Sequence, residues 1–196
     1  MLKIEMIWRE LLFCAIEKKI FKFTQKELSG KLGVSTSTIF QSLKVPRRIG
    51  AVEVGGRFFR IEDVQKLLYH WASVRNLQKD IIFEGHVEMS VLKIEGQMPP
   101  DVVFGAFSAA RQYLSAPPAD YDKIYVYAKD ASSIKARFEF SPGYKNLFVL
   151  RADALLWRYG NKTTLAQTFV DIWNLSDWQA KDFTRAIGEK INGLLS

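Results

Sequence analysis

The sequence predicts an α+β protein with two domains, over residues 1–78 and 81–196. Helical spacing of apolar residues and capping motifs dominate the first range, whereas short β-branched and aromatic runs alternate with helical segments in the second. The charge divides in the same way, because residues 1–80 hold 15 Lys and Arg against 8 Asp and Glu, while residues 81–196 hold 13 of each. Such a division is typical of a nucleic-acid-binding module joined to a domain with another task, with chance clustering of charge as the alternative.

Composition and cysteine content narrow the class of protein. The chain is 48% hydrophobic and 25% charged, which is typical of a folded globular protein. No run approaches the roughly 18 uncharged apolar residues of a membrane span, and the first ten residues carry acids where a secretory signal would be basic and then apolar. One cysteine, Cys14, and two histidines, His70 and His86, exclude a disulfide framework and a zinc ligand set. We therefore expect a cytoplasmic protein without a cofactor or a membrane partner.

The first range begins with three predicted helices. Apolar residues at three- and four-residue spacing predict a helix over residues 4–20. Thr24 and Glu27 form a capping box at the start of a second helix, and Gly33 favours the left-handed conformation that ends it. Ser35 then caps a third helix. The pattern is helix, tight turn, helix.

A hairpin and a fourth helix follow. Pro46 is expected to stop the third helix, because the residue before a proline disfavours the helical conformation. Residues 51–54 and 57–61 read as two strands joined by Gly55-Gly56, which can supply the positive φ angles of a two-residue turn. Residues 64–74 regain helical spacing, and acidic residues precede them at the positive end of the helix.

The segment TQKELSGKLGVSTSTIFQSLKVPRRIGAVEVGGRFFRI, residues 24–61, resembles the winged helix-turn-helix of prokaryotic transcription regulators. In such domains the second helix of the motif enters the major groove of double-stranded DNA, while the wing holds phosphates. The resemblance implies that base or phosphate contacts are made by Ser35, Thr36, Ser37, Thr38 and Gln41, with Thr38 and Gln41 as the base readers. It also implies phosphate neutralisation by Lys44, Arg47, Arg48, Arg57 and Arg60. A protein-docking module or spacer is the alternative.

The second range reads as a small mixed α/β domain. Helical spacing predicts helices over 84–96, 107–114 and 164–175, and another after Ser176, which forms a capping box with Gln179. Short apolar runs predict strands over 102–104, 124–128 and 147–150, with a further alternating stretch at Phe138 and Phe140.

One constellation in this range suggests chemistry. Gly105 and Ser108, followed after a helix by Asp120 and Asp122, are similar to the Gly-Ser and Asp-x-Asp pattern of nucleotidyltransferases, whose paired carboxylates hold Mg²⁺. The pattern is incomplete, because Ala106 intervenes and both acids precede the strand. We expect the two acids to lie on a solvated turn without a catalytic role; metal binding by them is the alternative.

His86 is the other candidate for chemistry in this range. A lone histidine beside Glu84 and Glu88 can serve as a general base or simply as a surface residue, and we favour the surface role.

The whole chain resembles the AbiEi-type antitoxins of abortive-infection (type IV) toxin–antitoxin systems. The resemblance rests on the winged helix, on PPDVVFGAFSAARQYLSAPPADYDKIYVYAK at 99–129 and on TLAQTFVDIWNLSDWQAKDFTRAI at 164–187. It implies a non-enzymatic repressor of its own promoter. Its carboxy-terminal domain would have a degenerate, non-catalytic nucleotidyltransferase-like fold and would oppose a nucleotidyltransferase toxin. We expect a homodimer, since two-fold proteins match inverted-repeat sites. The short, neutral second half departs from a charged toxin-binding surface, so a stand-alone regulator and a Mg²⁺-dependent nucleotidyltransferase are the alternatives.

Overall fold

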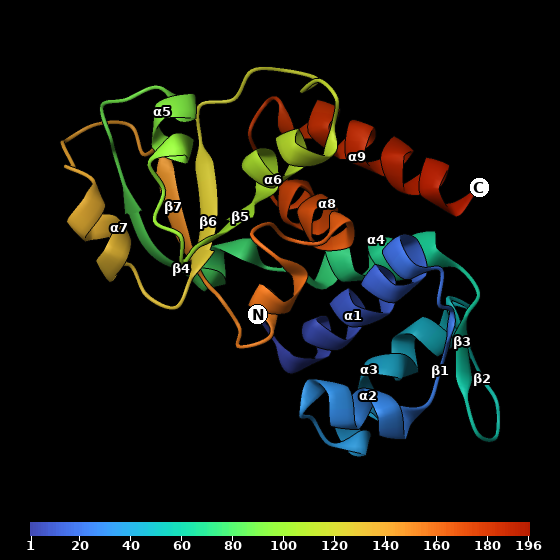
Figure 1. The fold of residues 1–196 in the computed structure, drawn as a ribbon. Helices are drawn as coiled ribbons and strands as arrows, with labels where there is room; N and C mark the ends of the chain where they lie inside the picture. The colour runs from blue at the N-terminus through green and yellow to red at the C-terminus, as the bar shows by residue number, and fades with distance from the viewer. The chain divides into compact units, whose positions relative to one another are not determined.

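The computed structural model describes residues 1–196 as a mixed α+β fold with nine α-helices and two small sheets (Figure 1). The chain divides into two compact units, residues 1–75 with 191–196, and residues 76–190. The last helix therefore contributes residues to both units. None of the helices combines the length and the apolar character that crossing a membrane requires.

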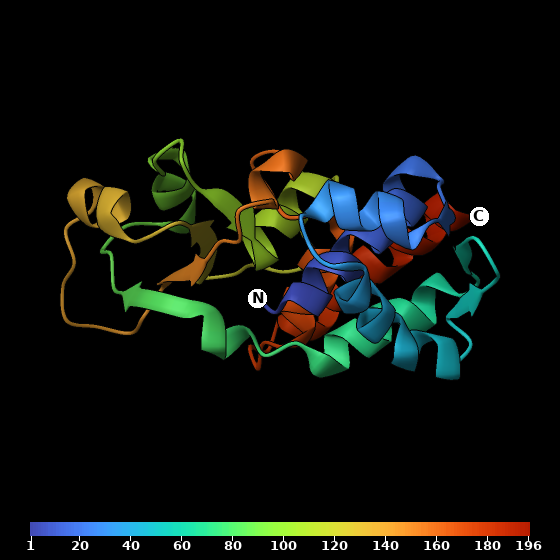
Figure 2. The same cartoon turned by 90° about the horizontal axis from the view of Figure 1, so that it is seen from below.

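The first unit contains four complete helices and a three-stranded sheet. In chain order its elements are α1 (Lys3–Lys18), β1 (Lys22–Phe23), α2 (Gln25–Leu32), α3 (Thr36–Arg48), β2 (Val52–Val54), β3 (Phe59–Ile61) and α4 (Val64–Val74). The strands lie in the order β1-β3-β2, and both pairs are antiparallel. Figure 2 shows α2 and α3, in blue, as consecutive helices joined by a short turn.

The predicted caps of α2 and α3 are confirmed. The Thr24 hydroxyl accepts the Glu27 amide, and the Glu27 carboxylate accepts the Thr24 amide. Gly33 ends α2 at a φ of 64°, and the Ser35 hydroxyl accepts the Thr38 amide at 3.1 Å. These hydrogen bonds span no more than a few residues, which is why sequence spacing found them.

The prediction that Pro46 stops the third helix is wrong, because α3 continues to Arg48. Proline has no amide to donate to the carbonyl four residues earlier, here that of Ser42. In the structure the Trp8 indole donates to that carbonyl at 2.9 Å. A side chain from α1 thus satisfies the acceptor that the proline leaves free, and the helix gains the turn that carries Arg47 and Arg48.

The hairpin also differs from the prediction. Val54 faces Phe59 across the strands, so the connection has four residues rather than two, closed by a bond from the Gly55 amide to the Phe58 carbonyl. Neither Gly55 nor Gly56 has a positive φ. Pairing of β1 with β3 adds a strand that the sequence pattern did not indicate, because two residues are too few to show alternation.

Two buried carboxylates on α1 have polar partners. The Glu5 carboxylate accepts the Trp71 indole at 3.2 Å and lies 3.5 Å from the Arg75 guanidinium. Glu10 accepts the Cys14 thiol at 3.2 Å. Burial, together with this carboxylate, raises the pKa of Cys14 to about 12, so the thiol stays protonated and serves as a packing residue.

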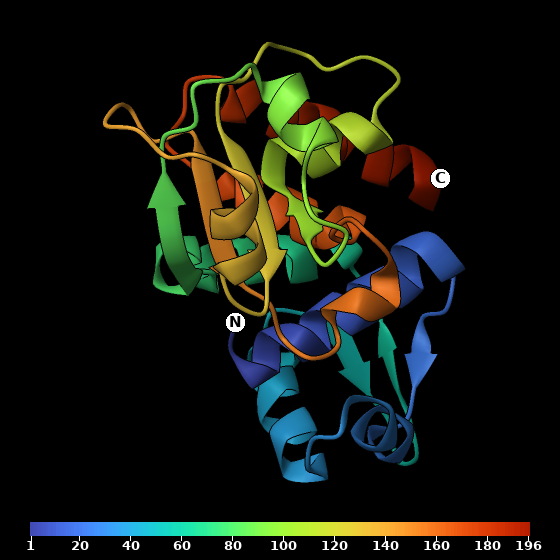
Figure 3. The ribbon, with the colours of Figure 1, turned by 60° about the vertical axis from the view of Figure 1, so that its left-hand side comes forward.

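The second unit is a four-stranded sheet between helices. Its elements are β4 (Ile81–Gly85), α5 (Val91–Gly96), β5 (Val103–Gly105), α6 (Ala106–Tyr113), β6 (Ile124–Ala128), α7 (Ser132–Arg137), β7 (Leu147–Arg151), α8 (Leu165–Trp173) and α9 (Ala180–Leu195). The strand order is β4-β7-β6-β5, with β6 and β7 parallel and both outer strands antiparallel to their neighbours (Figure 3).

Alternate side chains of β6 define the two faces of this sheet. Ile124 and Val126 pack with Ile94 of α5 and Ile134 of α7 in one buried cluster. On the other face, the Tyr127 hydroxyl donates to Asp171 of α8 at 2.6 Å. Burial on both faces explains why β6 is an unbroken apolar and aromatic run.

Three predictions for the second unit are wrong. Residues 84–96 do not form one helix, because residues 81–85 pair with β7 as an edge strand and the helix begins at Val91. The Phe138–Phe140 stretch is not a strand; Phe138 fills the core beneath the sheet and Phe140 packs on Phe83. The Ser176–Gln179 capping box does not form, since α9 begins at Ala180 and the buried Gln179 side chain has no hydrogen-bond partner.

Candidate nucleic-acid interface

Helix α3 has one buried and one exposed face. Its inward positions are Ile39, Ser42, Leu43 and Pro46. Exposed residues follow the complementary helical spacing and comprise Thr36, Ser37, Phe40, Gln41, Lys44, Arg47 and Arg48. Packing against the core constrains the residue types at the buried positions but not those at the exposed positions.

The exposed face of α3 is positively charged and has no acidic partner. No carboxylate lies within ion-pair distance of Lys44, Arg47 or Arg48. The Lys44 ammonium instead lies 5.5 Å from the ring centroid of Phe40, whose side chain is 49% exposed. Three unpaired cations on one helix face attract an anion that the protein itself does not provide.

The β2–β3 loop adds a fourth unpaired cation, Arg57, beside an aromatic residue. The neighbouring Phe58 is 42% exposed, and the Lys22 ammonium lies 3.6 Å from its ring centroid. Loop and helices share a hollow of about 380 Å³, which Arg57 and Phe58 line together with Lys26 of α2 and Thr36 of α3. The fold thus brings the loop and the beginnings of α2 and α3 together.

Arg60 is less available than its neighbours. Its guanidinium lies 3.4 Å from the Glu62 carboxylate, and Glu53 stands directly opposite it across the hairpin. An exposed pair of this kind is worth about 1 kcal/mol or less, so an incoming phosphate competes with Glu62 for Arg60.

The hydroxylic residues at the start of α3 fall into two groups. Ser35 and Thr38 bind each other, with their hydroxyl oxygens 2.8 Å apart, as part of the helix cap. Thr36, Ser37 and Gln41 are exposed and form no hydrogen bond through their side chains. Of the two residues expected to read bases, Gln41 therefore has a free amide, whereas the Thr38 hydroxyl is already engaged.

Sequence reasoning missed four residues of this surface. Lys22 and Lys26 are basic, and Phe40 and Phe58 are exposed aromatics. Helical spacing could have found Phe40, since it lies one turn before Lys44. Lys22 depends on the pairing of β1 with β3, which no local pattern indicates.

The acids considered for metal binding lie in the second unit. Asp120 and Asp122 are exposed in the segment before β6, and no group of three or more His, Cys, Asp or Glu residues that could hold a metal ion is present. His86 lies on the surface with Nδ1 2.8 Å from the Tyr144 carbonyl oxygen.

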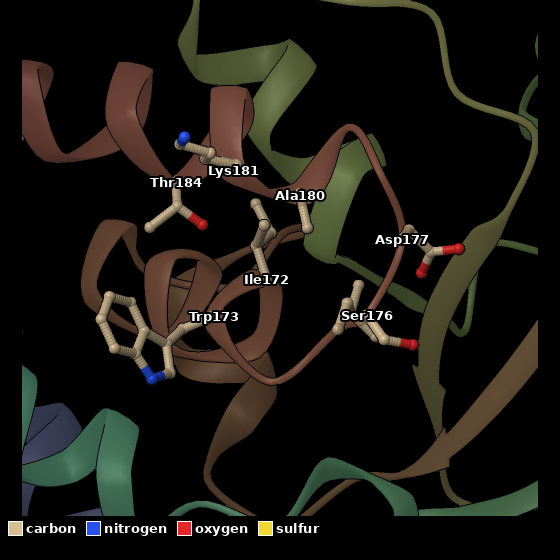
Figure 4. Close-up of a pocket in the computed structure, with 8 residues that line it drawn as sticks. Ile172, Trp173, Ser176, Asp177, Ala180, Lys181 and Thr184 are labelled. Carbon is tan, nitrogen blue, oxygen red and sulfur yellow. The ribbon is translucent and has the colours of Figure 1, made fainter.

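A shallow hollow of about 350 Å³ lies where α8 ends and α9 begins (Figure 4). Trp173 forms one side of it, and Lys181 and Thr184 of α9 form the other. The Asp177 carboxylate points away from this hollow in Figure 4 and pairs with Lys123.

Comparison of the chain with protein-family models, with curated proteins and with solved structures finds no match.

Proposed function

We propose that residues 1–78 form a winged helix-turn-helix domain and that the chain is a DNA-binding transcriptional regulator. Two helices joined at a left-handed glycine and followed by an antiparallel hairpin support the domain assignment. The observation that carries the proposal is the group of unpaired cations Lys44, Arg47, Arg48 and Arg57, in which three share one exposed helix face.

The chemistry of duplex DNA fits this surface. Phosphates supply the negative charge that Lys44, Arg47 and Arg48 lack, and counterion release makes such binding dependent on salt. In this proposal α3 lies in the major groove with Gln41 at a base edge, and Arg57 of the wing holds a phosphate. The regulator acts by occupying a promoter and excluding polymerase.

A narrower proposal concerns the biological role. We propose that the regulator is a cytoplasmic homodimer that represses its own promoter and opposes a nucleotidyltransferase toxin. The resemblance of residues 99–129 and 164–187 to AbiEi-type antitoxins supports this role. Light scattering that detects only a 22.5 kDa monomer, both free and on DNA, would contradict the dimer.

Fluorescence anisotropy tests the DNA-binding proposal. The full chain is titrated onto duplex DNA from upstream of its own gene and onto a scrambled duplex, at several salt concentrations. We expect tighter binding to the first duplex. Arg47→Ala and Arg48→Ala should weaken binding to both duplexes and lower the slope of log K against log salt by about 0.9 for each phosphate that is no longer neutralised.

The matched control is Arg137→Ala, which removes an equally exposed and unpaired arginine from the second unit. We expect its salt slope to equal that of the unmodified chain. Unchanged slopes in both α3 variants would contradict the proposal, as would equal and weak binding to both duplexes.

A further inference from the structure

A hollow of about 380 Å³ lies in the second unit and shares no residue with the surface proposed to bind DNA. Val91 and Leu92 of α5 line it on one side, and Arg111 and Leu114 line it at the end of α6. The segment that leads to β6 closes it with the residues Ser115, Pro117, Ala119, Asp120 and Tyr121. Ligand pockets commonly measure about 300–1,000 Å³, so this one suits a small molecule.

The cation in this hollow is held in place by a buried carboxylate. Arg111 Nη2 donates to Glu95 Oε2 at 2.7 Å, and the Tyr121 hydroxyl donates to Glu95 Oε1 at the same distance. The Glu95 side chain is only 7% exposed, whereas that of Arg111 is 40% exposed. A guanidinium has five N–H donors, so donors of Arg111 remain for a ligand after Glu95 is satisfied.

Tyr121 is fixed by its own surroundings. Its ring lies 5.7 Å from the rings of Phe107 and Phe183, measured between centroids. Burial raises the pKa of the Tyr121 phenol well above its usual range, and the hydrogen bond to Glu95 raises it further. The hydroxyl therefore remains a donor to Glu95 at neutral pH, and Glu95 keeps one orientation toward Arg111.

Charge balance narrows the class of ligand. Glu95 cancels the charge of Arg111, and the exposed carboxylate of Asp120 has neither a hydrogen bond nor an ion pair. A simple anion would meet Arg111 but would be repelled by Asp120, and a simple cation would leave the guanidinium donors unused. A zwitterion satisfies both residues at once.

The apolar lining of the hollow indicates which kind of side chain the ligand carries. Val91, Leu92, Leu114 and Pro117 line the hollow with apolar surface, and Leu92 is 63% exposed. Covering such surface with an apolar group is favourable by about 25 cal/mol per Å². We propose that this hollow binds an α-amino acid with an apolar side chain, whose carboxylate binds Arg111 and whose ammonium binds Asp120.

Isothermal titration calorimetry with the full chain tests this site directly. The probes are leucine, isoleucine, valine, methionine and phenylalanine, followed by the amine and the carboxylic acid that match the best binder. For leucine these are 3-methylbutylamine and 4-methylpentanoate. We expect saturable binding of at least one amino acid and binding about tenfold or more weaker for each single-charge analogue. Absence of binding by every amino acid in the panel overturns the proposal, as does an analogue that binds as tightly as its amino acid.

Two variants assign the charges. Asp120→Asn alters an exposed residue, so the fold is retained. It should weaken amino-acid binding about tenfold and strengthen binding of the carboxylic acid, because it removes the charge that repels a carboxylate. Arg111→Met should remove binding of both. Asp101→Asn, at an equally exposed and unpaired acid, is the matched control and should change neither. Unchanged amino-acid binding in Asp120→Asn overturns the proposed orientation of the ligand. Because binding is measured without DNA, either result is independent of the proposed regulator function.

Discussion

In the first unit, Lys44, Arg47 and Arg48 face solvent on one side of α3 without a carboxylate partner, whereas in the second unit Lys123 pairs with Asp177 and Arg111 with Glu95. The overall balance differs in the same direction, because all of the net charge of +7 lies before residue 81. Cations that are paired within the fold hold its elements together. Cations that are grouped and unpaired remain available to bind an anionic partner.

Reversing the charge on the exposed face of α3 should have the largest effect of all. Replacing Lys44 and Arg47 with Glu puts acids where we propose that phosphates lie, so DNA affinity should fall by about a hundredfold to a thousandfold. The free energy of unfolding should change by less than about 0.5 kcal/mol, since neither side chain is paired. The double variant Lys129→Glu, Arg137→Glu makes the same change in the second unit and should retain DNA affinity in the anisotropy assay. Equal losses in both double variants would show that only net charge matters.

The hydrogen bond that supports the end of α3 gives the next largest effect. Trp8→Phe removes the donor to the Ser42 carbonyl and leaves that acceptor buried beside Pro46. The free energy of unfolding should fall by about 2–3 kcal/mol, from the unsatisfied carbonyl and the smaller side chain. Denaturant titration measures this. Trp178→Phe, at a side chain that is 76% exposed, should leave stability within about 0.5 kcal/mol. A stable Trp8→Phe protein would mean that another group satisfies Ser42.

Removing the partner of a paired cation should lower stability without changing DNA affinity, which is the opposite of what we expect for the α3 variants. The Lys123 and Asp177 side chains are 16% and 10% exposed, so Asp177→Asn leaves a largely buried ammonium without its counterion. We expect a loss of about 1–2 kcal/mol in thermal or denaturant unfolding and no change in DNA affinity. Arg185→Gln breaks the exposed pair with Asp182 and should cost less than about 1 kcal/mol. Comparable losses in the two variants would indicate that burial does not strengthen the Lys123 pair.

The smallest expected effect concerns pH. Burial lowers the pKa of His70 below 6.5, and the nearby positive charge of Arg48 lowers it further. As the pH falls below about 6.5, His70 becomes protonated in the unfolded chain but stays neutral in the folded chain. Its contribution to stability is therefore present above that pH and is lost below it. Unfolding midpoints measured between pH 7.5 and about 5.5 should therefore decline, and His70→Gln should reduce the decline. An equal decline in His70→Gln would show that other groups cause the loss of stability at low pH.

Local elements of the first unit were predictable because their determinants lie within one helical turn. The Thr24 capping box, the left-handed Gly33 and the Ser35 cap each depend on residues no more than four positions apart. For the same reason the sequence located α3 and its basic residues. Spacing and charge, together with the resemblance to a winged helix-turn-helix, thus outlined the candidate interface.

Elements that depend on distant partners were not predictable. Pro46 lies inside α3 because a tryptophan 34 positions before Ser42 donates to the carbonyl that the proline leaves free. Residues 81–85 form a strand because β7 pairs with them, although the apolar spacing of residues 84–96 predicted a helix that begins at Glu84. The site residues Lys22 and Phe58 come together only when β1 joins β3.

By itself, the sequence determined the α+β class, the capped helices of the first unit and the concentration of positive charge there, because composition and short-range hydrogen bonds do not require knowledge of the fold. The tertiary structure alone decided which charges are neutralised. Arg60 and Arg111 meet carboxylates, whereas Lys44, Arg47, Arg48 and Arg57 meet none, and this depends on which side chains approach within about 4 Å after packing.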